Sequence, residues 1–356
     1  MVTWRQIADR AIDALGVCRG DLVQIREHSD RVDVLLEMAL AVERAGATPL
    51  PELTPSTYVR RLLADADLEY LAHWDRHRTD WLQQIDRVLV LDGPRPGMAE
   101  VPAAALAAWS AATGRLATLE DKRRLPYLLV AIPSSERASE VSRSLDALEA
   151  HLLPALAVPV TVLQEQIHRV TAHVHEAREV TVHSGGGAEL RMSVAGRRWL
   201  SDDGLIDAED RAVGTHVSNL PAGSIYTTVV ETSPDGQLLL PHAAGAVDVR
   251  LTFRNGRITD VTAREGGDRF VELLQRHDGD RDRVSHIGIG LNPLLREFIG
   301  WPLVDEHVHG AIFVALGENR YLGGENGSSL NIDLVLPAAT LTVDQHLLVD
   351  EGRIRV

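Results

Sequence analysis

The run His286-Ile-Gly-Ile-Gly-Leu-Asn-Pro293, followed further along by Gly323-Gly-Glu-Asn-Gly-Ser-Ser-Leu-Asn-Ile-Asp333, is the most distinctive part of this sequence. The two segments carry several donor side chains, among them the imidazole of His286, the carboxamide of Asn331 and the carboxylate of Asp333. Imidazole and oxygen donors are typical ligands of divalent metal ions. The two segments are therefore the part of the chain where a functional site is expected first.

Both segments resemble signatures of the thermophilic metalloaminopeptidases, the aminopeptidase T family. The first family signature is Glu-Leu-Gly-x-Gly-x-Asn-Pro, and the second is a His-x-Asp that closes a Gly-Gly-x-Asn stretch. In this chain His286 replaces the Glu, Asn331 replaces the His, and Asp333 is unchanged. The resemblance therefore implies that these three residues are the candidate metal ligands. Roughly residues 175 to 356 carry specific family motifs, whereas the first 160 residues match only in pattern.

Two further segments match the family but lack a ligand. Asn219-Leu-Pro-Ala-Gly-Ser-Ile-Tyr226 has Ser224 where the family has a Glu that bridges two metal ions, and Asp305 to Gly317 has Phe313 where the family has a ligand His. A hydroxyl and a phenyl ring cannot balance the charge of two divalent ions. We therefore expect no conventional two-metal peptide hydrolysis.

At the first signature the chain is more similar to a related group on the same scaffold, the 2,5-dihydroxypyridine dioxygenases. In that group a His stands at the position of His286, and a His-x-Asp stands at Asn331-Ile-Asp333, which together give the two-His-one-carboxylate triad of non-haem Fe(II) enzymes. The resemblance implies a mononuclear Fe(II) enzyme, dioxygenase-like, acting on a small aromatic or amino-acid-derived molecule. It also implies a homodimer.

Two alternatives remain open at this point. One is a divergent metallohydrolase that uses Zn, Co or Mn. The other is a metal-free protein, either an enzyme in which His286 acts as a general base paired with Asp333, or a binding module. The metal content of the protein would separate them.

Several residues near the two signatures are candidates for proton or substrate chemistry. His309, and with it His307, would lie on a strand at the rim of the site as an acid or base. Tyr321 would donate to a developing oxyanion, and Arg320 would anchor an anionic or phenolate substrate. Ser224 and Tyr226 are further candidates for substrate binding. Each has an ordinary structural alternative, such as a solvated strand-end histidine, a packed aromatic ring or a surface arginine.

Composition narrows the class of protein. The net charge of -15 and the absence of a dense Lys/Arg run argue against nucleic acid as a partner. No segment reaches the roughly 18 apolar residues that a membrane span needs, so we expect no membrane partner. Cys18 is the single cysteine, which excludes an intrachain disulfide and favours a reducing compartment, the cytoplasm.

The chain as a whole predicts an α/β fold in two domains, residues 1–158 and 159–356. In the first domain, short apolar runs at 22–25, 88–91 and 127–132 predict buried strands, and helices are expected over 30–45, 57–72 and 102–115, the first with Asp30 as its N-cap. This alternation predicts a parallel sheet covered by helices. No Gly-rich nucleotide loop follows any of these strands.

After a helix expected over 159–175, the pattern changes to short alternating strands separated by turns. Pro234-Asp-Gly236, Asn255-Gly256 and Asp350-Glu-Gly352 each predict a hairpin, and one helix is expected over 267–277. The second domain is therefore predicted to be an antiparallel, barrel-like α+β domain that carries all the site residues.

Overall fold

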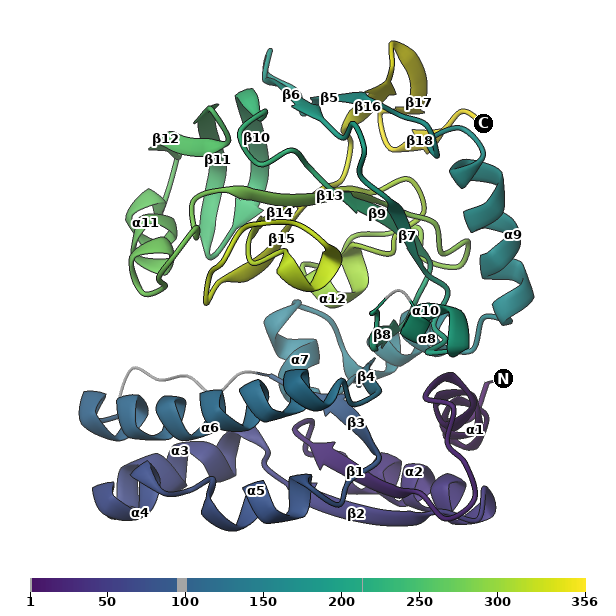
Figure 1. Ribbon diagram of the computed structural model, residues 1–356, viewed down its shortest axis with the longest axis vertical. Helices are drawn as coiled ribbons and strands as arrows, with labels where there is room; N and C mark the ends of the chain where they lie inside the picture. Colours follow the sequence, from purple (N-terminus) through teal and green to yellow (C-terminus); the bar gives the residue numbers. More distant parts are fainter. Residues whose placement is uncertain (1, 95–100, 213) are drawn as a thin grey trace. The chain divides into compact units, whose positions relative to one another are not determined.

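The computed structural model describes residues 2–94, 101–212 and 214–356, which divide into two compact units (Figure 1). Unit 1 consists of Met1–Ala157 and Gly204–Pro221, and unit 2 consists of Val158–Asp203 and Ala222–Val356. The segment 204–221 thus belongs to unit 1, although in the sequence it lies within the predicted second domain.

Unit 1 contains a parallel sheet of five strands, with the order β2-β1-β3-β4-β8. These strands are β1 (Leu22–Glu27), β2 (Thr48–Leu53), β3 (Arg87–Asp92), β4 (Tyr127–Ala131) and β8 (Val217–Leu220). The three strands predicted from apolar runs are confirmed as β1, β3 and β4. The two edge strands were not predicted. Pro49 and Pro51 in β2 cannot donate to a ladder and are tolerated only at a sheet edge, and β8 comes from a distant part of the chain.

The helices of unit 1 pack on the parallel sheet and on one another. They are α1 (Trp4–Ala14), α2 (Val32–Arg44), α3 (Ser56–Asp65), α4 (Leu68–Ala72), α5 (Arg76–Leu82), α6 (Ala103–Arg123), α7 (Ser135–Glu140), α8 (Leu145–Leu156) and α10 (Ala208–Ala212). The single helix expected over 57–72 is wrong. Asp67 caps a new helix there by accepting hydrogen bonds from the backbone N–H groups of Glu69 and Tyr70. Asp30 is not the N-cap of α2, because Arg31 takes that position and Asp30 has a φ of 61°.

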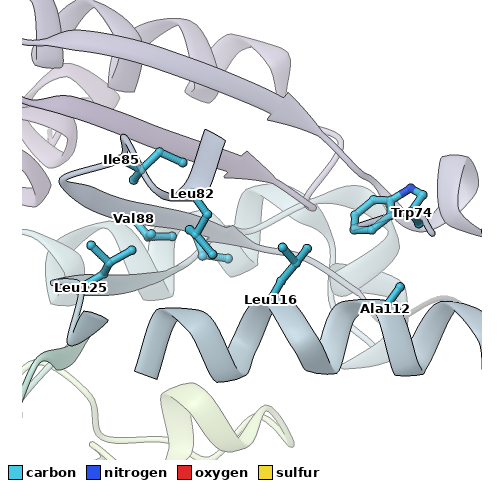
Figure 2. Packing of buried hydrophobic residues seen from close by; sticks show 8 residues of the cluster. Trp74, Leu82, Ile85, Val88, Ala112, Leu116 and Leu125 are labelled. Atoms are coloured by element: carbon cyan, nitrogen blue, oxygen red, sulfur yellow. The ribbon is translucent and has the colours of Figure 1, made fainter. Parts of the chain in front are cut away.

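The core of unit 1 on one side of β3 is shown in Figure 2. Ala112 and Leu116 of α6 pack there with Val88 of β3 and with Leu82 and Ile85, which precede β3. Every residue of 88–91 is buried, so both faces of the strand are covered. This is the arrangement expected of a parallel sheet between helices.

Unit 2 contains two antiparallel sheets, of eight and five strands. The first has the order β12-β11-β10-β6-β5-β16-β17-β18 and the second the order β15-β14-β13-β9-β7. The strands are β5 (Glu179–His183), β6 (Glu189–Ser193), β7 (Trp199–Asp202), β9 (Ser224–Thr228), β10 (Asp235–Ala243), β11 (Ala246–Arg254), β12 (Arg257–Thr262), β13 (Val284–Gly290), β14 (Ile312–Gly317), β15 (Asn331–Leu336), β16 (Thr340–Val343), β17 (His346–Asp350) and β18 (Arg353–Ile354).

Four short helical segments complete unit 2, namely α9 (Val160–Thr171), α11 (Gly267–Gln275), α12 (Pro302–Asp305) and the 3-10 turn η1 (Arg320–Leu322). In Figure 1, α11 lies beside β11 and β12, and α12 lies beside β15. The described part of the chain contains no single helix long and apolar enough to cross a membrane. Only when the bent pair α8 and α9 is counted together are its length and composition sufficient for a membrane span.

Two of the three predicted hairpins of unit 2 are confirmed. Asn255 and Gly256, with φ of 50° and 78°, connect β11 to β12 as a type I′ turn requires. The segment 350–352 connects β17 to β18. The hairpin expected at 234–236 is wrong, because β10 begins at Asp235 and pairs with β6 and β11 rather than with the strand before it.

Candidate functional site

The candidate centre lies on β13, the middle strand of the five-stranded sheet of unit 2. Val284 pairs with Leu316 of β14 and Ile287 pairs with Val314, so Ser285 and His286 together face the single residue Ala315. Two residues opposite one is the pattern of a β-bulge, a device that re-aims a side chain next to a site. Ala315 in turn pairs with Asp333 of β15. The bulge therefore places His286 next to the residue in which the second signature ends.

His286 and Asp333 are in direct contact. The Nε2 atom of His286 lies 3.1 Å from Oδ1 of Asp333, and its Nδ1 atom lies 2.9 Å from the hydroxyl oxygen of Ser285. His286 is 5% exposed, whereas Asp333 is half-buried. Two of the predicted ligands are thus brought together, with both imidazole nitrogens engaged.

Aromatic rings line the His286 side chain. The ring centroid of Tyr226 lies 5.9 Å from that of the imidazole, and the ring of Phe313 lies 6.0 Å from it, edge to face. Tyr226 and Phe313 both pair with Gly288, which has no side chain to fill the space between them. A Cβ atom at this position would overlap the Phe313 ring. Gly288 therefore keeps this face of β13 open for the two aromatic side chains.

Asn331 and Tyr321 form a second contact close to Asp333. The Nδ2 group of Asn331 donates to the Tyr321 hydroxyl at 3.0 Å. The side chain of Tyr321 is 46% exposed, but burial of its hydroxyl, followed by the nearby charge of Asp333, raises the pKa of Tyr321. The hydroxyl therefore keeps its proton at neutral pH and can donate to an anionic oxygen.

A buried charged cluster that sequence analysis did not identify lies near Asp333. Nε2 of His307 lies 3.2 Å from Oε1 of Glu306 and 3.9 Å from Oδ2 of Asp202. Burial opposes the charge on His307, but the hydrogen bond and charge of Glu306, with the charge of Asp202, raise the pKa of His307. Burial, followed by the charge of Asp333, raises the pKa of Glu306. The cluster is thus linked electrostatically to the candidate centre.

The strand expected around His307 and His309 is wrong. These residues lie in turns between α12 and β14, where the backbone of 306–308 packs over Gly290. His309 contacts Arg296, with Nη1 of the arginine 3.3 Å from Nδ1 of the imidazole. Burial, followed by the charges of Arg296 and Arg169, lowers the pKa of His309 to about 4. His309 is therefore neutral at pH 7 and is not a general acid there.

The lowered pKa of His309 predicts a specific acid sensitivity. Unfolded histidine binds a proton with a pKa of about 6.5, so between that pH and about 4 this residue binds more protons in the unfolded chain than in the folded one. The free energy of unfolding should therefore fall as the pH is lowered through this window. We expect His309→Gln to lose less stability than the wild type between pH 7 and pH 5, measured by urea unfolding. The matched control is His346→Gln at an exposed position, which should behave as the wild type. Equal losses in wild type and His309→Gln would contradict the prediction.

The two remaining candidates for substrate binding lie away from the His286 contact. Ser224 is buried and pairs with Gly290, four residues along β13 from His286, or about 13 Å at the usual rise of a strand. Arg320 is exposed, and its guanidinium packs over Gly327 while its backbone N–H donates to Glu318. Sequence proximity to a signature therefore did not bring either side chain to the imidazole.

The donors at the centre fit one metal ion better than two. Among the described residues, no three His, Cys, Asp or Glu side chains are grouped as a metal site requires. Two donors bound to one ion at about 2.0–2.2 Å and at a right angle to one another would lie about 3 Å apart, which is close to the 3.1 Å between His286 and Asp333. The third donor available on the same strand face as Asp333 is the carboxamide of Asn331. The set lacks the second imidazole of a two-His-one-carboxylate triad.

Comparisons with known proteins agree with the fold. A search of curated proteins finds no match. Among solved structures, wild-type AmpT from Thermus thermophilus is similar over 99% of each chain, with 18% identity and a TM-score of 0.77. The 2,5-dihydroxypyridine dioxygenase from Pseudomonas putida KT2440 is similar over 99% of this chain and 97% of its own, with 17% identity and a TM-score of 0.63. The predicted fold class, a parallel-sheet α/β domain followed by an antiparallel β-rich domain, is confirmed.

The family of this chain is shown by a match to a family sequence model, because structures at such low identity show only the fold. The model of the 2,5-dihydroxypyridine 5,6-dioxygenase family matches residues 139–356, which is more than half of the chain and includes every residue of the candidate centre. The predicted resemblance to this branch of the scaffold is confirmed, and the protein is an enzyme. The chain belongs to the 2,5-dihydroxypyridine 5,6-dioxygenase family.

Proposed function

We propose that the protein is a metal-dependent enzyme that acts on a small aromatic or amino-acid-derived molecule, with one divalent ion, Fe(II) favoured, held by His286 and Asp333. The family and the fold support a metal-dependent enzyme on this scaffold. The observation that carries the proposal is the 3.1 Å separation of His286 Nε2 and Asp333 Oδ1, which suits two neighbouring donors on one ion. When bound, Fe(II) would supply the redox chemistry that the family name implies.

The residues around the centre suit a flat, hydroxylated substrate. Tyr226 and Phe313 offer aromatic surface beside the imidazole, and stacked or edge-to-face contacts between rings are favourable. The Tyr321 hydroxyl, which retains its proton, can donate to a phenolate or carboxylate oxygen. In this proposal these three residues bind and orient the substrate.

The proposal is tested by metal content and oxygen uptake together. Protein purified without oxygen and incubated with Fe(II) should retain one equivalent of iron and should consume oxygen with 2,5-dihydroxypyridine or another small hydroxylated aromatic. Retention of no iron, or of two equivalents of zinc, cobalt or manganese, would overturn it. Substrates that bind without turnover should still raise the melting temperature, because a ligand of the folded state alone adds stability.

The side chain at position 331 should determine how tightly Fe(II) binds. Asn331→His would complete the triad of two imidazoles and one carboxylate, and imidazole is a stronger ligand for Fe(II) than a neutral carboxamide. We expect Fe(II) affinity to rise at least about tenfold, measured anaerobically by competition with a chelator. Asn331→Gln, which keeps the carboxamide, should show no such gain. An unchanged affinity in Asn331→His would mean that the side chain at 331 does not face the metal.

A second candidate function rests on the same contact. A distance of 3.1 Å is also that of a hydrogen bond, so His286 could act as a general base oriented by Asp333 without metal. This candidate requires turnover that survives complete removal of divalent ions by a chelator. Loss of turnover on metal removal, with recovery on addition of Fe(II), would exclude it.

Homodimer formation is a further proposal, implied by the resemblance to the family rather than by any contact of this chain. We expect a dimer at micromolar concentration in light scattering. A monomer at that concentration would contradict it.

A further inference from the structure

Ser285 lies directly before His286 and is 0% exposed. Its hydroxyl oxygen lies 2.9 Å from His286 Nδ1 and 2.9 Å from the backbone carbonyl oxygen of Glu318. A carbonyl oxygen only accepts hydrogen bonds, and a serine hydroxyl has one proton to donate. The Ser285 proton is therefore donated to Glu318, and the contact with His286 requires that Nδ1 carries a proton and donates it to Ser285.

This assignment leaves Nε2 as the nitrogen with the free lone pair in a neutral imidazole. Asp333 is also an acceptor, so its 3.1 Å contact with Nε2 requires either a second proton, on Nε2, or a metal ion between the two atoms. We propose that Ser285 is a positioning residue that holds His286 as the Nδ1–H tautomer, so that Nε2 and Asp333 form a two-atom acceptor for a metal ion or a proton.

The hydroxyl itself is held in place by the surrounding backbone. Asn319 is fully buried, and its Nδ2 group donates to the carbonyl oxygen of Ser285 at 3.0 Å and to Oε1 of Glu231 at 3.1 Å. Glu231 is also bound by Arg197 at 2.6 Å. Buried hydrogen bonds thus fix the backbone at residue 285 and at residues 318–319. The Ser285 hydroxyl oxygen therefore stays within reach of both Glu318 and His286.

The β-bulge explains why adjacent residues can make this contact. In a regular strand, successive side chains point to opposite faces of the sheet. Because Ser285 and His286 together occupy one pairing position opposite Ala315, the hydroxyl of one reaches the ring of the other. The inference goes beyond the proposed function and does not depend on it, since it rests on the hydrogen bonds of Ser285. A lone pair on Nε2 suits a metal ligand, whereas the general-base candidate would donate a proton from Nε2 to Asp333.

The tautomer can be read directly by long-range proton–nitrogen correlation NMR of protein labelled with 15N-histidine, with the His286 signals identified by their loss in His286→Gln. In the metal-free wild type, neutral His286 should carry its proton on Nδ1. Ser285→Ala should move the proton to Nε2, where it can be donated to Asp333. Ser285→Thr, which restores a hydroxyl, should return it to Nδ1.

A matched control lies on the neighbouring strand. Thr227 is also fully buried, pairs with Ile287, and donates its hydroxyl to the carbonyl oxygen of Arg198 rather than to a histidine. Thr227→Val should therefore leave the His286 tautomer unchanged. A proton on Nε2 of neutral His286 in the wild type, or an unchanged tautomer in Ser285→Ala, would overturn the proposal. The wild-type spectrum tests it even if Ser285→Ala fails to fold.

Discussion

His286→Gln is expected to lose both bound Fe(II) and turnover. The side chain supplies the only imidazole in contact with Asp333 among the described residues, and one carboxylate with one carboxamide is a weak set for Fe(II). Loss of an outer partner of a metal ligand already costs about 10–100-fold in affinity or activity, so loss of the ligand itself should cost more. Metal content after anaerobic purification and oxygen uptake measure the two effects.

The choice of variant and control matters because His286 is buried. His286→Ala would leave a space beside Tyr226 and Phe313, and changes of this kind destabilise proteins by about 0.5–3 kcal/mol. Gln fills more of that space, and thermal unfolding should show that the fold persists. His309→Gln, at a histidine of the same unit that contacts Arg296, should keep full metal content. Stoichiometric iron in His286→Gln would refute the assignment of this ligand.

Aminoacyl peptides and aminoacyl nitroanilides should be cleaved negligibly, even with added cobalt, zinc or manganese. Hydrolysis by a two-metal site needs ligands that hold two ions about 3.5–4 Å apart. The described residues contain no group of three metal-ligating side chains, and the phenyl ring of Phe313 stands beside the imidazole where the aminopeptidase pattern has a ligand. Enzymes accelerate reactions by about 10⁶-fold or more, so the expected deficit is large.

The assay needs a known metalloaminopeptidase run in parallel under the same metal conditions as its positive control. Asp333→Ala distinguishes the possible outcomes, because a residual rate that comes from this centre must disappear in that variant. Robust metal-stimulated release of an N-terminal amino acid, lost in Asp333→Ala, would restore the hydrolase alternative and refute the one-metal proposal.

Local patterns in the sequence determined the class of fold. The apolar runs of β1, β3 and β4 predicted a parallel sheet because strands buried on both faces are apolar throughout. Asn255-Gly256 predicted its hairpin because both residues tolerate positive φ. Periodicity failed where a single side chain decides the outcome, as at Asp67, which caps a new helix inside an otherwise continuous helical pattern.

The sequence by itself also predicted that His286 and Asp333 lie together, because His286 begins one signature of a known scaffold and Asp333 ends the other. Only the tertiary structure decided which other residues reach them. The pairing register places Ser224 of β9 opposite Gly290, four residues along β13 from His286. Glu306, in the turn after α12, lies near Asp333, and His309 contacts Arg296. The β-bulge at 285–286 is set by pairing between strands far apart in the chain. No local pattern could therefore show that Ser285 and His286, adjacent in sequence and expected on opposite faces, touch one another.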